Sequence, residues 1–321
     1  MAKKVLLNKP VHEAGMKVLA GKAEPVVAPD ASAETIRRLA ADVEGILLRT
    51  GTQIGRDIIE AAPKLKVISR TGAGVDTVDV AAAGEKGILI CHTPGVNSPS
   101  VAEHAVALLL ALAKQLKPMD RAVAAGNWKI RNTYKAVDLA GKTLGLVGIG
   151  RIGMLVAAKC RTAFEMKTIA YDPFVEDAED IDLCADLKQV FRQADFVSIH
   201  VPYTKQTHHL VGAELLACMK PDACLINTAR GAVVDEKALT AALQGSAIAG
   251  AGLDVFDPEP PSPDNPLFKL DNVIATPHTA ALSSQCVARV AAEAAQAVVD
   301  VFSGKRPKYI YNPDALKSKN P

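Results

Sequence analysis

The 321-residue sequence lacks long basic runs, C-x-x-C pairs and apolar stretches of membrane-spanning length. Its formal net charge is only +2, so nucleic acid and acidic membrane surfaces are not expected as main partners, whereas small anionic substrates are compatible with it. The longest apolar stretch, residues 105–113, is well short of the roughly 20 residues that a transmembrane helix needs. Asn8 and Lys9 interrupt the apolar run that follows the basic N-terminus, so no signal peptide is predicted.

The six cysteines are too sparse for a disulfide framework, and their spacing does not indicate a metal site. Reduced thiols in a cytoplasmic protein are therefore expected. No repeat of solenoid length is present. A chain of this length is suited to about two domains.

Two series of short apolar runs alternate with helical segments. The runs are residues 5–7, 25–28, 45–48, 67–69 and 88–91, then 144–148, 168–171, 196–200, 224–227, 248–253 and 273–275. Such runs are typical of parallel strands that are buried on both faces. The sequence predicts two doubly wound α/β domains with a cleft between them: a smaller flavodoxin-like substrate domain (residues 1–98 and 287–321) and a Rossmann dinucleotide-binding domain (residues 99–286).

Two helices are expected near the domain boundaries. An Ala- and Leu-rich helix, starting with a capping box of Ser100 and Glu103, is predicted to continue to about Leu116. Its apolar face packs either within the chain or against a second subunit. A last helix is predicted over residues 282–302, and the tail at 308–313 is expected to return to the first domain as an edge strand.

A glycine turn follows the first strand of the second series. Gly148, Gly150 and Gly153 fit a tight turn, a close backbone approach to a pyrophosphate, and tight packing of helix on strand. The helix start supplies free N–H groups for an anion. Asp172 lies nineteen positions after Gly153, at the end of the next predicted strand, where a carboxylate binds the adenosine ribose. Because it would repel the 2′-phosphate of NADP, NAD is the predicted cofactor.

Polar residues follow the later strands of this domain. Arg230, Glu259 and His278 come after the fourth, fifth and sixth strands, and His200, Val201 and Pro202 after the third are expected to form a wall of the cofactor site. Taken singly, the arginine could form a surface salt bridge, the glutamate could lie in a rigid solvated loop, and the histidine could be structural.

Together these three residues suit the oxidation of a 2-hydroxy acid. An imidazole can take the hydroxyl proton as hydride leaves. A carboxylate behind the imidazole orients it and favours its charged form. A guanidinium can hold the substrate carboxylate through two parallel hydrogen bonds.

Six stretches in order resemble the D-isomer-specific 2-hydroxyacid dehydrogenase family, with its phosphoglycerate dehydrogenase branch the most similar. They are residues 71–76 (TGAGVD), 100–104 (SVAEH), 148–153 (GIGRIG), 229–231 (ARG) with 234–236 (VDE), 253–256 (LDVF) with 259–260 (EP), and 276–278 (TPH). The resemblance implies an NAD-dependent enzyme, a homodimer, in which Arg230 anchors the substrate, Glu259 orients the histidine and His278 is the acid/base.

The resemblance also implies ligand contacts. For the substrate they are the amides of Gly72, Ala73 and Gly74, with Arg49 and Asn97. For the cofactor they are Gly148, Gly150, Arg151, Ile152, Gly153, Asp172, His200, Val201, Pro202, Thr207, Thr228, Ala229, Asp254, Ala280 and Ala281, with Asp254 on the nicotinamide carboxamide and His278 and Thr279 beside it.

The choice of substrate stays open at this stage. Arg49, Arg70, Arg131 and Lys135 could bind a phosphate or be solvated surface charges. A glyoxylate/hydroxypyruvate reductase or a general 2-ketoacid reductase is the alternative enzyme, and an NAD-sensing corepressor is a binding-protein alternative. A formate dehydrogenase is disfavoured because Glu259 stands where that enzyme has glutamine.

The sequence departs from the family pattern in two places. Glu165 stands where relatives often have glycine, in a segment that is one residue longer. The sequence ends soon after Asn312, so the regulatory domain of many phosphoglycerate dehydrogenases is not expected.

Overall fold

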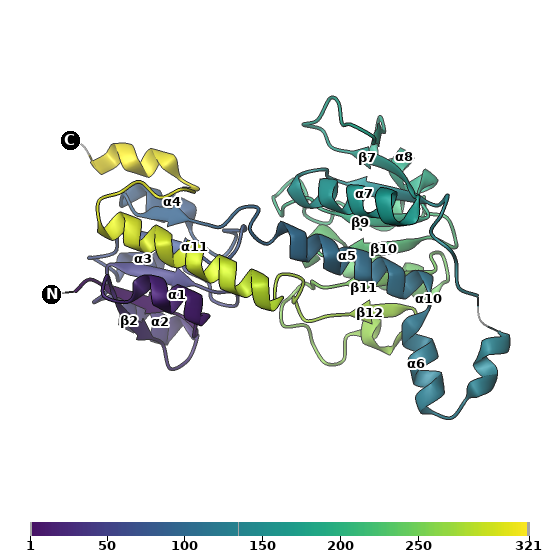
Figure 1. Ribbon diagram of the computed structural model, residues 1–321, viewed down its shortest axis with the longest axis horizontal. Helices are drawn as coiled ribbons and strands as arrows, with labels where there is room; N and C mark the ends of the chain where they lie inside the picture. Colours follow the sequence, from purple (N-terminus) through teal and green to yellow (C-terminus); the bar gives the residue numbers. More distant parts are fainter. Residues whose placement is uncertain (1, 134, 320–321) are drawn as a thin grey trace. The chain divides into compact units, whose positions relative to one another are not determined.

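The structure is a computed structural model that describes residues 2–133 and 135–319. The chain divides into two compact units (Figure 1). The first contains the residues up to Asn97 and those from Leu282 onward, and the second is Ser98–Ala281. None of the described helices has the length and apolar character needed to cross a membrane.

The first unit is a five-stranded parallel sheet in the order β2-β1-β3-β4-β5. Its strands are β1 (Lys4–Leu7), β2 (Glu24–Val27), β3 (Gly45–Leu48), β4 (Val67–Arg70) and β5 (Leu89–Cys91). Its α-helices are α1 (Glu13–Leu19), α2 (Ala33–Ala40), α3 (Arg56–Glu60), α4 (Val80–Glu85) and α11 (Ser284–Phe302). The parallel sheet predicted for this part of the sequence is confirmed.

Strand residues of this sheet alternate between two cores. Leu6, Ile46 and Ile68 pack with α2, α3 and α4, whereas Val5 and Leu47 belong to the cluster that α1 and α11 cover. Both faces of the central strands are therefore buried, which explains why β3 is apolar throughout and β1 is apolar from Val5 to Leu7.

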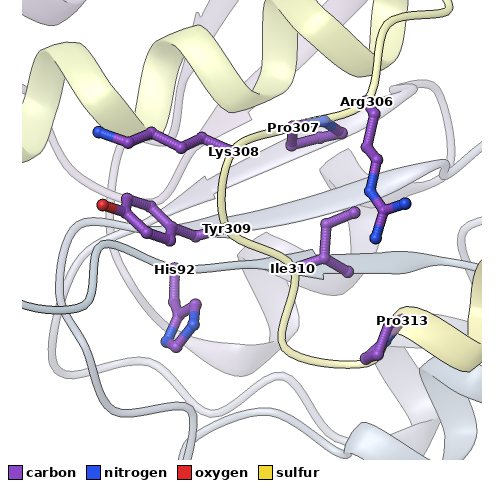
Figure 2. A pocket seen from close by; sticks show the side chains of 7 residues that line it. All are labelled: His92, Arg306, Pro307, Lys308, Tyr309, Ile310 and Pro313. Carbon is purple, nitrogen blue, oxygen red and sulfur yellow. The ribbon is translucent and has the colours of Figure 1, made fainter.

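The tail after α11 pairs with the edge of this sheet. Ile310 forms an antiparallel bridge with Cys91, and the Tyr311 N–H donates to the Ile90 carbonyl at 2.8 Å. The side chain of Asn312 accepts from the Ile90 N–H and donates to the Ile88 carbonyl. The predicted return of the tail to this domain is confirmed. A pocket of about 290 Å³ lies beside the tail. The side chains that line it are those of His92, Arg306, Pro307, Lys308, Tyr309, Ile310 and Pro313 (Figure 2).

The second unit is a seven-stranded parallel sheet in the order β12-β11-β10-β9-β6-β7-β8. Its strands are β6 (Thr143–Val147), β7 (Lys167–Tyr171), β8 (Asp182–Leu183), β9 (Phe196–Ile199), β10 (Cys224–Asn227), β11 (Gly250–Leu253) and β12 (Val273–Ala275). After β8 the chain returns to the other side of β6, so the strand order reverses between β6 and β9. The carboxyl ends of these two strands are where such folds bind ligands.

Two groups of helices cover this sheet (Figure 1). One face packs against α5 (Ser98–Ala113) and α7 (Arg151–Phe164). The other packs against α8 (Leu187–Gln193), α9 (Ala213–Leu216) and α10 (Glu236–Gln244). The apolar face of α5 lies on its own sheet: a Cβ added to Gly252 would stand 3.0 Å from the Leu108 Cβ. This packing answers the question that the sequence left open for that helix.

Three predictions about local structure were wrong. Helix α5 begins at Ser98, so Ser100 lies in its first turn and does not cap it, and Glu103 forms an ion pair with Lys159 at 3.5 Å. The helix ends at Ala113, and a separate helix α6 (Leu116–Ala124) follows a left-handed Gln115. Six strands were expected in the second unit, and the seventh, β8, has only two residues, too few to produce an apolar run.

Candidate active site

The glycine turn after β6 leaves little room for side chains where backbone segments meet. Gly148 has φ +87°, and a Cβ there would lie 2.8 Å from Val201 Cγ1. A Cβ on Gly153 would lie 2.4 Å from the Gly148 carbonyl oxygen, which holds α7 tightly against the turn. Gly150, the N-cap residue of α7, instead faces open space. The start of α7, with Arg151 and Ile152, is thus accessible to a phosphate.

Asp172 places its carboxylate beside this turn. It follows β7, and its Oδ2 accepts from the Ile149 N–H at 3.1 Å while its Oδ1 accepts from the Phe174 N–H at 3.0 Å. Two main-chain donors therefore fix the carboxylate. Its place at the end of the strand next to β6 is the one that a ribose-binding acid occupies in this fold.

His200 lies beneath the glycine turn. Its ring is 3.6 Å from where a Cβ on Gly153 would stand, and its Nε2 is 2.9 Å from Ser198 Oγ. Burial lowers the pKa of His200 to about 4, so the ring is neutral at physiological pH. A neutral imidazole packed against the turn suits a structural wall.

The segments after β9 and β10 complete this edge of the sheet. The Thr207 hydroxyl donates to the Pro202 carbonyl at 2.7 Å and so fixes the loop that carries Val201. Thr228 Oγ1 is buried and finds no hydrogen-bond partner within residues 2–133 and 135–319. A buried hydroxyl without a partner is costly, so it fits a bound ligand that supplies one.

Arg230 is positioned by a strand residue that the sequence analysis missed. Buried Asn227 donates from Nδ2 to the Arg230 carbonyl at 2.9 Å and accepts from the Ala229 N–H at 3.0 Å. A Cβ on Gly231 would lie 2.0 Å from the Phe256 carbonyl carbon. The main chain next to Arg230 is therefore in close contact with the loop after β11. An asparagine that ends an otherwise apolar strand was the available signal.

Glu259 and His278 form a hydrogen-bonded pair. Glu259 Oε2 is 2.7 Å from His278 Nδ1, and its Oε1 accepts from the Phe256 N–H at 3.1 Å. Burial alone would raise the pKa of Glu259, but the hydrogen bond and charge of His278, the Phe256 N–H and the charge of Arg230 outweigh it and lower the pKa below its ordinary value. The carboxylate therefore stays ionised behind the imidazole.

Asp254, at the end of β11, holds the segment around His278. Its carboxylate is fully buried and accepts from the Thr276 hydroxyl at 2.6 Å, the Thr279 N–H at 2.8 Å and the Ala280 N–H at 2.9 Å. Its carbonyl accepts from the His278 N–H at 2.8 Å. His278 has φ +53°, a left-handed conformation that surrounding bonds must maintain.

In the first unit, each carbonyl group of the turn at residues 72–74 contacts a nitrogen of a neighbouring residue within hydrogen-bonding distance. Gly72 O accepts from the Thr93 N–H, Ala73 O is 2.8 Å from His92 Nδ1, and Gly74 O accepts from Arg70 Nε. In the part of the chain that the structure describes, the N–H groups of these three residues make no hydrogen bond. Consecutive free amides of this kind suit an anion.

The candidate phosphate-binding cations differ in surroundings. Arg70 is only 6% exposed and also donates to Thr77 Oγ1, so it braces the 72–74 turn. Arg49 donates to the Pro10 carbonyl at 2.7 Å. Arg131 and Lys135 are exposed and lie in the second unit. Asn97 Oδ1 is buried and has no partner among the described residues.

A doubly wound sheet with a glycine turn and an acid at neighbouring strand ends defines a dinucleotide-binding domain. Residues 106–280 match the family model described as D-isomer specific 2-hydroxyacid dehydrogenase, NAD binding domain. The chain belongs to the D-isomer-specific 2-hydroxyacid dehydrogenase family. The family resemblance, the fold class and the nicotinamide dinucleotide cofactor predicted from the sequence are thereby confirmed.

Named relatives fall into two groups. The D-3-phosphoglycerate dehydrogenase of Methanocaldococcus jannaschii is 41% identical over 96% of this chain and 59% of its own length. The hydroxypyruvate reductase of Thermotoga maritima is 39% identical over 90% and 95%. A solved NADPH-dependent glyoxylate/hydroxypyruvate reductase of Sinorhizobium meliloti, in complex with NADP and malonate, has a TM-score of 0.88 at 29% identity and 98% coverage of both chains. The chain thus spans about three fifths of the phosphoglycerate dehydrogenase.

Proposed function

We propose that this protein is an NAD-dependent D-2-hydroxyacid dehydrogenase. It transfers hydride between C2 of a D-2-hydroxy acid and NAD, and it reduces the 2-keto acid in the reverse direction. The observation that carries the proposal is the Glu259–His278 pair at 2.7 Å, together with Arg230, whose charge acts on the same carboxylate, at the ends of three adjacent strands.

His278 is proposed as the acid/base. Because a carboxylate only accepts, the ring donates from Nδ1 to Glu259, and the neutral imidazole then has its lone pair on Nε2. Nε2 takes the hydroxyl proton during oxidation and returns it during reduction. The ionised Glu259 stabilises the imidazolium that forms in between.

Arg230 is proposed to bind the substrate carboxylate, and the amides of the 72–74 turn are proposed as substrate-binding groups of the first unit. The guanidinium offers two parallel N–H donors, and Gly72, Ala73 and Gly74 offer free amides. Replacing Arg230 with lysine keeps the charge but loses the planar fork, so KM is expected to rise or kcat to fall.

The cofactor residues are proposed as follows. The glycine turn with Arg151, Ile152 and Thr228 would hold the pyrophosphate, and Asp172 would hold the ribose. Val201, Pro202, Thr207, Ala229, Asp254, Ala280 and Ala281 would line the remainder. Bound NAD supplies the hydride acceptor at nicotinamide C4, and the charge of Asp172 favours NAD over NADP.

The test is a steady-state comparison of wild type with His278→Ala. Wild type should reduce hydroxypyruvate or glyoxylate with NADH, or oxidise 3-phosphoglycerate with NAD. The variant should lose at least about a hundredfold in kcat, the usual scale for a positioned acid–base group. A near-normal rate would remove His278 from this role.

The substrate is proposed to be phosphoglycerate-like. Similarity to phosphoglycerate dehydrogenases supports it, whereas relatives of matching length support a hydroxypyruvate or glyoxylate reductase. Assays of 3-phosphoglycerate and hydroxypyruvate on wild type and Arg49→Ala separate the two. A phosphate-binding Arg49 predicts a loss with 3-phosphoglycerate alone.

We also propose a cytoplasmic homodimer. None of the side chains of helix α6 is fully buried, and Leu116 and Val123 are each more than half exposed. Trp128, in the nearby turn of 3-10 helix at Trp128–Asn132, is also more than half exposed. Such apolar exposure suits contact with a second copy. Sedimentation velocity of Val123→Glu checks it, because the charged variant should sediment as a monomer.

A further inference from the structure

A chain of hydrogen-bonded polar side chains leads from helix α5 to the segment that carries His278. His104, on α5, places its Nε2 2.9 Å from Thr276 Oγ1, and Thr276 Oγ1 is 2.6 Å from Asp254 Oδ1. His104 Nε2 is also 3.5 Å from that carboxylate oxygen. The His104 side chain is 23% exposed and that of Asp254 only 1%.

The direction of the hydrogen bonds follows from the number of protons. The Thr276 hydroxyl has a single proton. Asp254 is surrounded by two main-chain N–H groups and this hydroxyl, so it acts as the acceptor. Since Thr276 gives its proton to Asp254, its oxygen must accept the other bond, and His104 must donate from Nε2.

We propose that His104 is a positioning residue for the acid/base histidine, acting through Thr276 and Asp254. The proposal rests on the proposed role of His278. In this chain of hydrogen bonds, the Nε2–H of His104 orients the Thr276 hydroxyl toward Asp254. Asp254 in turn binds residues on both sides of His278. Thr276 precedes it, and Thr279 and Ala280 follow it.

The consequence for His278 is a fixed main chain in an unfavourable conformation. Its φ of +53° is sustained by its own N–H bond to the Asp254 carbonyl and by the bonds on either side of it. Without the donor from His104, the Thr276 hydroxyl can rotate away from Asp254 and leave the carboxylate with one bond fewer. The imidazole is then less well aligned with the substrate oxygen.

The experiment compares two replacements of His104. His104→Leu removes the donor, and His104→Gln retains an N–H donor at a similar reach. His104→Leu should lower kcat for keto-acid reduction about tenfold, with the KM for NADH changed less than twofold, since alignment is lost while binding persists. His104→Gln should recover most of kcat. Glu103→Gln, a replacement of the exposed neighbour on the same helix, should behave as wild type.

A double-mutant cycle with Thr276→Val tests the chain of bonds itself. Each single variant breaks the same chain, so the double variant His104→Leu/Thr276→Val should be no slower than the worse single variant. Independent, multiplying losses would overturn the proposal, as would a normal kcat in His104→Leu or no recovery in His104→Gln. Thermal unfolding of each variant verifies that it is folded.

Failure of this inference can be told apart from failure of the proposed function. If wild type turns over a 2-keto acid and His278→Ala does not, the acid/base assignment stands whatever His104 does. If wild type shows no turnover with any 2-keto or 2-hydroxy acid, the proposed function fails, and the role of His104 fails with it.

Discussion

Asp172 gives the sharpest test of cofactor choice, because two main-chain N–H groups hold its carboxylate beside the glycine turn. A carboxylate fixed in this way cannot swing aside for a 2′-phosphate. Like charges at about 4 Å near a protein surface repel by about 1–4 kcal/mol, which corresponds to roughly a fivefold to a thousandfold penalty on NADP. The substitution Asp172→Asn removes this charge while keeping the shape of the side chain.

The amide also changes the contacts with NAD and with the turn. Its oxygen can replace one carboxylate acceptor, but its NH₂ group then faces the Ile149 or the Phe174 N–H, and a lost bond to a charged group costs about 1.5–3 kcal/mol. This cost falls on both cofactors, whereas the loss of repulsion benefits NADP alone. We therefore expect kcat/KM for NADH to fall about tenfold or more. The NADPH/NADH ratio of kcat/KM should rise by at least about fivefold.

The assay measures kcat/KM for NADH and NADPH with one saturating keto acid, for wild type and Asp172→Asn. Glu165→Gln, which removes a carboxylate elsewhere in the second unit, controls for the change in net charge. Equal efficiency of wild type with both cofactors, or an unchanged ratio in Asp172→Asn, would refute the reasoning.

Three further predictions follow from local contacts. Arg70→Met removes the donor to the Gly74 carbonyl, so the KM for the keto acid should rise at least about fivefold while the KM for NADH is unchanged; equal rises in both would contradict this role. Glu165→Gly relieves a left-handed residue at the C-cap of α7, so urea denaturation should give about 0.5–1 kcal/mol of added stability, and Glu165→Ala, which keeps the Cβ, should give none. The pKa of Glu259 in the folded protein lies below the unfolded value of 4.5. The ionised carboxylate therefore contributes to stability above about pH 4.5, and this contribution is lost as the pH falls through the folded pKa. The free energy of unfolding of wild type should accordingly drop more steeply below about pH 5 than that of Glu259→Gln.

Segments that are buried on both faces could be predicted from the sequence, because burial requires apolar residues at nearly every position. The long strands of both sheets are buried on both faces, so their apolar runs identified them to within about two residues. Strand β8 and helix α6 were missed for different reasons. The first has two residues, too few for an apolar run. The second repeats apolar residues at helical spacing, at Leu116, Met119 and Val123, but it has Pro118 in its first turn, and its start at the left-handed Gln115 depends on the folded main chain.

The candidate site was predictable where chemistry coincides with a strand end. Arg230, Glu259 and His278 could be proposed because each follows a strand of one parallel sheet. Asn227 and His104 could not, because their roles depend on partners that only the folded chain brings near. The bond from His104 joins atoms of residues 172 positions apart.

The second unit is one continuous segment of the chain, whereas the first unit is made of two segments that flank it, and this difference affects folding during biosynthesis. The second unit is continuous, so all of its strands are available once residue 281 has been made. Most of the first unit precedes the second unit in the sequence, yet α11 and the Ile310–Asn312 edge segment, which help to cover Val5, Leu7 and β5, follow the second unit. While the ribosome translates the second unit, α1 is therefore the sole helical cover that has been made for this apolar face of the sheet, among the described residues. Aggregation or chaperone binding of nascent chains should accordingly depend on the first unit, although its strands are made before those of the second unit.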